Sequence, residues 1–137
     1  MEQTNIHIEN PINTNLQVQL YSKKAIYGFS LFFTSIFGGV LLRQNLLDLG
    51  KKKEANNALL LSIGLTLISY VIIFNIENVG SSATLICNLI GGLILSEFYW
   101  TLHIPKDLKI ENKKIWKPLI ISVCITLPFI ILAVLYN

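Results

Sequence analysis

The sequence predicts an all-α membrane protein with four transmembrane helices, arranged as two helical hairpins behind a short N-terminal tail. Three observations lead to this fold class. Hydrophobic residues make up 53% of the 137 residues and charged residues only 14%, against about 25% charged residues in soluble domains. Four apolar segments, at 25–42, 58–76, 83–102 and 118–136, are each roughly 18–20 residues long, enough to span a hydrocarbon core of about 30 Å. Finally, the basic residues gather in alternate connections between these segments.

The chain divides into a polar N-terminal tail, 1–22, and a transmembrane domain, 23–137. In the tail, hydrophobic and polar residues alternate at 6–8 and at 16–20, on either side of a turn-forming stretch that contains Pro11. This pattern predicts two short strands joined as a hairpin. Because a lone hairpin is marginally stable in water, two alternatives stay open. The tail is disordered, or it gains stability by lying on the helices or on a partner's sheet.

Small residues mark the helix surfaces that are expected to pack together. Gly38 and Gly39 form a pair in the first segment, and Gly91 and Gly92 form a pair in the third. Lipid provides no hydrophobic force between helices, so close backbone approach at small residues contributes much of the packing. The sequence therefore predicts that the first helix packs on the third. The first helix is expected to continue into the connection and to end at Gly50.

The second and fourth segments also resemble each other. Ser62 and Thr66 in the second are matched by Ser122 and Thr126 in the fourth, with similar apolar neighbours. Together with the two glycine pairs, this match predicts an internal duplication. The duplicated units are then two parallel helical hairpins, related by a pseudo-two-fold axis along the membrane normal. Coincidence is the alternative, because apolar segments draw on few residue types.

The distribution of positive charge predicts the orientation in the membrane. Lys23 and Lys24 precede the first segment, and the second connection has no basic residue. The positive-inside rule places the first and third connections in the cytoplasm, which leaves both termini outside; Lys23 and Lys24 argue against that arrangement. Those two connections hold the other nine of the eleven basic residues: Arg43, Lys51, Lys52, Lys53, Lys106, Lys109, Lys113, Lys114 and Lys117.

Three polar residues form a candidate membrane site. Glu97 is the one acidic residue clearly inside an apolar segment, and a carboxylate at membrane depth is a functional candidate by default. If the first and third helices touch, Arg43 lies at a similar depth and pairs with Glu97. The alternatives are a Glu97 that reaches the interface, or a proton or ion site there. Asn88 lies near mid-span, where an amide serves more often as an interhelical hydrogen-bonding group than as a substrate ligand.

The sequence predicts no enzyme, no cofactor, no metal and no nucleic-acid partner. No nucleophile elbow, phosphate-binding glycine loop or paired-carboxylate arrangement is present. His7 and His103 belong to separate regions, and Cys87 and Cys124 lack the spacing of metal ligands. The net charge of +3 comes from the connections, so it indicates topology rather than a nucleic-acid surface.

A resemblance to a known family rests on the stretch 20–55. This stretch begins with Tyr21 and Ser22, continues through a phenylalanine-rich helix with the glycine pair, and ends on a Leu-Gly-Lys sequence at Leu49. In these features the chain resembles a family of small, uncharacterised bacterial membrane proteins. Members often carry a proline where this chain has Ile36. The resemblance implies a bacterial, Bacteroidota-like origin and a multi-pass topology, and it implies no activity.

Two functional hypotheses follow from the sequence. The first is a non-enzymatic integral membrane protein of the bacterial inner membrane, acting as an accessory or interaction subunit of a larger envelope assembly, with immunity or defence as one version of that role. Its partners are the lipid bilayer and either another protein or a second copy of the chain. The second hypothesis is a small oligomeric transporter or channel, with Glu97 and Asn88 on its path.

Overall fold

The computed structural model describes residues 17–76 and 80–136, and these are predominantly helical. Three helical segments are long and apolar enough to cross a membrane, Lys52–Asn75, Ser82–His103 and Trp116–Leu135, with mean hydropathies of 2.1, 1.5 and 2.7. They correspond to the second, third and fourth segments predicted from the sequence. The elements in chain order are β1 (Val18–Leu20), α1 (Lys23–Phe32), α2 (Ser35–Asp48), α3 (Lys52–Asn75), α4 (Ser81–Leu93), η1 (Ile94–Tyr99), α5 (Trp100–His103), β2 (Ile110–Asn112) and α6 (Trp116–Leu135).

The prediction of one continuous helix over 25–42 is wrong, and the four-span architecture is not confirmed. This segment forms two short helices, α1 and α2, with a break at Phe33 and Thr34. Thr34 has an extended backbone, with φ 175° and ψ 165°, so the chain cannot continue helically through it. At about 1.5 Å per residue, α1 is about 15 Å long and α2 about 21 Å. Neither helix is long enough to span a hydrocarbon core of about 30 Å.

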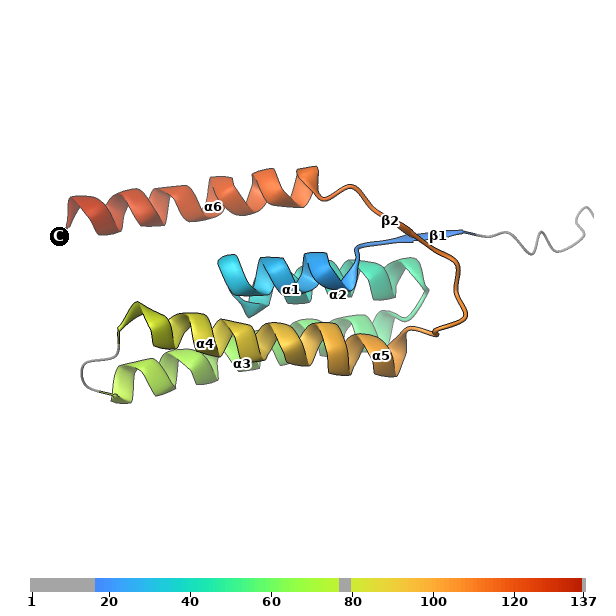
Figure 1. The fold of residues 1–137 in the computed structure, drawn as a ribbon, viewed down its shortest axis with the longest axis horizontal. Coiled ribbons are helices and arrows are strands. Elements are labelled where there is room, and N and C mark those ends of the chain that lie inside the picture. Colours follow the sequence, from blue (N-terminus) through green and yellow to red (C-terminus); the bar gives the residue numbers. More distant parts are fainter. Residues whose placement is uncertain (1–16, 77–79, 137) are drawn as a thin grey trace, which may run out of the picture.

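Helices α1 and α2 form an antiparallel hairpin (Figure 1). The register follows from two contacts. At the open end, Tyr21 bonds to Asn45, and nearer the turn, Gly38 lies directly against Ser30. The turn itself is closed by Phe33, whose ring lies 5.6 Å from those of Phe29 and Phe37. The hairpin therefore begins and ends at the same end of the molecule.

The connection from α2 to α3 is a short turn that depends on one glycine. Gly50 has a φ of +74°, a left-handed conformation that L side chains rarely adopt. Its N–H donates to the Leu47 carbonyl at 2.9 Å, and the N–H of Lys51 donates to the Leu46 carbonyl at 2.8 Å. These two bonds satisfy carbonyls that the end of a helix leaves unpaired. The prediction that Gly50 ends this helix is confirmed.

The third predicted segment is one continuous helical rod built from α4, η1 and α5. Within η1 the helix widens to a π-type turn, in which the N–H of Trp100 donates to the Leu95 carbonyl five residues earlier. Gly91 in this rod lies against the Ser35 side chain, and Gly92 lies against Ser30 and Tyr27. The rod therefore packs on both helices of the hairpin. Figure 1 shows the hairpin beside the parts of α3 and α4 nearer to α5, but not beside their far ends.

The tail ends in a strand, β1, as predicted, and among the described residues this strand pairs with β2. Strand β1 pairs with β2, in parallel, with Val18 opposite Ile110. The other predicted strand, 6–8, lies outside the described residues. Because the two strands are parallel, α1 and α6 leave this small sheet in the same direction (Figure 1). Pairing with β2 also supplies the backbone partners that β1 needs, while Leu20 becomes completely buried.

Helix α6 stands apart from the other helices (Figure 1). Ser122 is its only buried residue, and all residues of α6 are described. The duplication predicted from the sequence is not confirmed at the level of packing. Thr66 and Thr126 do make the same bond, each donating to the carbonyl of the serine four residues earlier. However, α3 packs closely on α2, whereas α6 has no comparable contact with α4.

We expect Gly39→Ala to destabilise the fold, because a methyl group at this position would overlap the Ser62 side chain of α3. Overpacking of this kind costs about 1–3 kcal/mol. Gly64→Ala is the matched control, since nothing lies within 4 Å of the added methyl group and alanine favours helices by about 0.5–1 kcal/mol over glycine. Unfolding in mild detergent measures both. Equal losses of stability would contradict the close contact between α2 and α3.

Candidate functional site: the basic end and the hairpin

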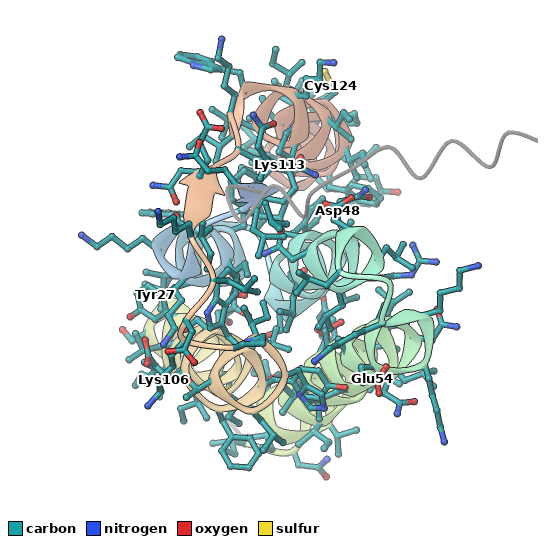
Figure 2. All side chains as sticks on the ribbon, turned by 90° about the vertical axis from the view of Figure 1, so that its right-hand side faces the viewer. Tyr27, Asp48, Glu54, Lys106, Lys113 and Cys124 are labelled. Carbon is teal, nitrogen blue, oxygen red and sulfur yellow. The ribbon has the colours of Figure 1, made fainter. Side chains whose placement is uncertain are left out.

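All eleven Lys and Arg residues lie toward one end of the helices, and the described residues place the carboxylates Asp48, Glu54 and Glu97 there as well. This basic end is formed by the sheet, the open end of the hairpin, the α2–α3 turn, α5 and the start of α6. Figure 2 shows it face on, with Lys113 and Asp48 between α6 and α2. The opposite ends of α3, α4 and α6 carry exposed apolar side chains, including Phe74 and Leu135.

Asn45 holds the open end of the hairpin together. Its side-chain Oδ1 accepts a hydrogen bond from the Tyr21 N–H at 2.7 Å, and its Nδ2 donates to the Tyr21 carbonyl at 2.9 Å. Asn45 is completely buried, so both bonds form away from water, where an unmade hydrogen bond is costly. Ser22 caps α1 by accepting from the N–H of Ala25. The chain is thereby fixed where it passes from β1 into α1.

Two further hydrogen bonds connect α3 to the end of the α4–α5 rod. The Tyr99 hydroxyl donates to the Glu54 carbonyl at 2.9 Å, and the Lys51 ammonium donates to the His103 carbonyl at 2.6 Å. A cation at this position also interacts favourably with the negative end of a helix dipole. The ring of His103 stacks on Tyr99, with centroids 4.1 Å apart. These contacts close the basic end around the buried Leu46 and Leu95.

The predicted pairing of Arg43 with Glu97 is wrong. Glu97 lies 3.2 Å from the Lys23 ammonium, which also donates to Thr101 at 3.1 Å. The hairpin explains the change, because it brings the start of α1 beside η1 and so places Lys23 next to Glu97. The Glu97 side chain is 62% exposed, at the surface of the basic end. Arg43 has no ion pair among the described residues, and its Nε is buried without a hydrogen-bond partner.

Asn88 contacts the hairpin at its other end. Its Nδ2 donates to the Leu31 carbonyl over 3.5 Å, a long hydrogen bond to one of the carbonyls that the end of α1 leaves without a helical partner. Glu97 lies nine residues further along the same rod, about 13 Å away along the axis at helical rise. The structure therefore does not bring Asn88, Glu97 and Arg43 together as one site.

Two hollows open on the surface of the basic end. The first, of about 380 Å³, lies between the sheet, α2 and the start of α6, and residues such as Gln44, Lys114 and Lys117 line it. The second, of about 220 Å³, lies between α1 and the rod, beside Lys23 and Glu97. Neither hollow was predicted from the sequence, because each is formed by segments far apart along the chain. The one sequence feature that points to these hollows is the mixture of basic and acidic residues in the connections.

Chemically, this end of the molecule offers ammonium groups, amides and carboxylates, of which Asp48 and Glu97 are in ion pairs. Within the described parts of the chain, no group of three or more His, Cys, Asp or Glu side chains gathers where it could hold a metal ion. Cys87 and Cys124 are free thiols on different helices. No family model, no curated protein and no solved structure matches this chain. Any functional proposal for this protein therefore rests on its geometry alone.

We expect Asn45→Ala to lower the free energy of unfolding by about 2 kcal/mol, because it removes both side-chain partners of the Tyr21 backbone and unsatisfied buried groups cost about 1–3 kcal/mol each. Asn57→Ala is the control, since Asn57 is exposed on α3 and surface changes of this kind stay within about 0.5 kcal/mol. Thermal unfolding in mild detergent distinguishes the two. A wild-type stability for Asn45→Ala would show that the hairpin does not need this contact.

Proposed function

We propose that this protein is a non-enzymatic interaction subunit of a bacterial membrane assembly, and that α6 is the helix that contacts its partner. The body of the molecule consists of the α1–α2 hairpin, α3 and the α4–α5 rod. Its helices are joined by close contacts at Gly38, Gly39, Gly91 and Gly92. Helix α6 is joined to this body mainly through the linker that carries β2. Its apolar surface is therefore free along most of its length.

The single observation that carries this proposal is the exposure of α6. Only 6% of its most apolar 18-residue stretch is buried, against 33% for the rod. In lipid, helices associate through packing and hydrogen bonding. A membrane helix that stands away from its own bundle loses these interactions unless a helix of another chain supplies them. Thr126 lies beside the buried Ser122 on the same helix. Such small polar residues are typical of interhelical contact surfaces.

The orientation that we propose differs from the one expected from the sequence. If α1 and α2 enter the bilayer as a re-entrant hairpin and return to the same face, then Lys23 and Lys24 share that face with the other nine basic residues. The positive-inside rule then has no exception, and that face is cytoplasmic. Segments α3, α4–α5 and α6 are the three spans. The N-terminal segment is inside and the C-terminus outside.

The transporter hypothesis receives less support from the geometry. A break in a membrane helix is a feature of transporter binding sites, and the hairpin has such a break at Thr34. Yet Asn88 of the rod contacts the Leu31 carbonyl, and Ser35 fills the space against Gly91. Glu97 is paired at the surface with Lys23. These contacts favour a packed hairpin over a path.

We expect cysteine labelling to find the start of α1 on the same side as the two basic connections. In a chain without Cys87 and Cys124, a membrane-impermeant maleimide added to intact spheroplasts should label Ser82→Cys. It should label Lys24→Cys, Lys52→Cys and Lys109→Cys only after permeabilisation, because all three lie at the basic end. Labelling of Lys24→Cys in intact spheroplasts, with Lys52→Cys protected, would restore the four-span topology.

We expect α6 to cross-link to a protein in native membranes. A photoreactive residue at Phe129 or Leu132, which are 73% and 64% exposed, should give one protein adduct of constant mass. The same residue at Phe74 of α3, which is 88% exposed, is the control and should give lipid adducts. A partner mass of 15.4 kDa would identify a second copy of the chain. Lipid adducts alone at all three positions would contradict the proposed role.

A further inference from the structure

We propose that the larger hollow at the basic end, between α2 and the start of α6, binds the phosphate headgroup of an anionic phospholipid. The headgroup would lie against Lys114 and Lys117, with Gln44 on the opposite wall. Its acyl chains would continue into the bilayer along α6. This inference concerns a lipid ligand of the basic end and does not depend on which protein, if any, contacts the outer face of α6.

The hollow has a suitable size for such a ligand, and it lies at a suitable level in the membrane. Its volume of about 380 Å³ falls within the range of about 300–1,000 Å³ that is usual for small-molecule sites. Trp116, next to Lys117, is 68% exposed at the first residue of a membrane-length helix. Exposed tryptophans in this position lie at the level of the lipid headgroups. A hollow beside Trp116 therefore lies where phosphates are found.

The charges that line the hollow leave two lysines to receive an anion. Lys113 is already paired with Asp48 and lies 5.3 Å above the Tyr21 ring. The carboxylate of Glu111 accepts a hydrogen bond from Gln19 at 3.0 Å. Among the described residues, no ion pair involves Lys114 or Lys117. Basic pockets between membrane helices on the cytoplasmic side are typical sites for anionic headgroups.

The smaller hollow is a poorer site for the same ligand. Its lining includes both Lys23 and Glu97, and these two side chains form an ion pair. That pairing leaves Lys24 as the one lysine of this lining without an ion pair among the described residues, whereas the larger hollow has two, Lys114 and Lys117, beside its single carboxylate, Glu111. The larger hollow also differs in its position, because its walls come from the sheet, from α2 and from α6. A headgroup bound in it would bridge α6 to the hairpin. The protein itself makes few contacts between these two parts.

The test measures lipid binding to the full-length protein by native mass spectrometry in mild detergent. Phosphatidylglycerol is titrated against phosphatidylcholine, and inorganic phosphate is titrated separately. The site variant is Lys114→Gln with Lys117→Gln. The matched control is Lys52→Gln with Lys53→Gln, which removes the same charge from exposed residues at the same end but outside the hollow. Gln44→Ala removes a wall of the hollow without changing any charge.

We expect the wild-type protein to prefer phosphatidylglycerol. The site variant should lose about tenfold in affinity, because each lysine near an anionic headgroup contributes substantially to binding. The control variant should lose less than about twofold, because its charges are screened by solvent. Gln44→Ala should weaken binding, while phosphatidylcholine and inorganic phosphate should bind weakly throughout.

Three results would overturn the proposal. Equal losses in the site and control variants would indicate diffuse surface attraction rather than a site. Equal affinity for phosphatidylglycerol and phosphatidylcholine would show that the negative charge is not recognised. Inorganic phosphate that binds as tightly as the lipid, and that the site variant loses, would assign the hollow to a free anion. Unfolding temperatures of all variants, measured in detergent without lipid, establish that each binding change is local.

Discussion

The fold depends on the close approach of helix backbones where a glycine of one helix meets a serine of another. Gly39 receives Ser62 of α3, Gly91 receives Ser35 of α2, and Gly92 receives Ser30 of α1. Ser30 and Ser62 donate their hydroxyl protons to carbonyls of their own helices, so they bring no unpaired donor into the contact. In lipid, where apolar side chains gain nothing by leaving solvent, contacts this close provide much of the association energy.

These contacts also explain why the first apolar segment can fold back on itself. In the proposed re-entrant arrangement the turn lies at membrane depth, where lipid cannot satisfy exposed backbone groups, so it must lie within protein. Here the N–H groups of Phe33 and Thr34 both donate to the Phe29 carbonyl, and Asn88 reaches the Leu31 carbonyl from the rod. Asn45 performs the corresponding task at the open end. The hairpin is thus held at both ends by side-chain amides.

Hydropathy and length predicted the three long helices closely, and Gly50 predicted the end of α2, because these signals are local. The hairpin could not be predicted in the same way. No proline or glycine marks the break at Thr34. An apolar segment of this length predicts a transmembrane helix whether or not the segment folds back. The wrong prediction of Arg43 as the partner of Glu97 followed from that error. The pairing of β1 with β2 joins residues 92 positions apart, which no pattern in either segment indicates. The glycine pairs were recognised as packing residues, but their partner serines emerge only from the fold.

The parallel pairing of β1 with β2 has a consequence for how the protein is made. Strand β2 leaves the ribosome only after α3 and the α4–α5 rod have been synthesised, so β1 must wait for this partner through most of translation. During that time β1 has to stay in the compartment where β2 will emerge. Once the two strands join, they tether the chain just before α1 to the linker before α6. Insertion of α6 and anchoring of β1 are therefore coupled steps of biogenesis.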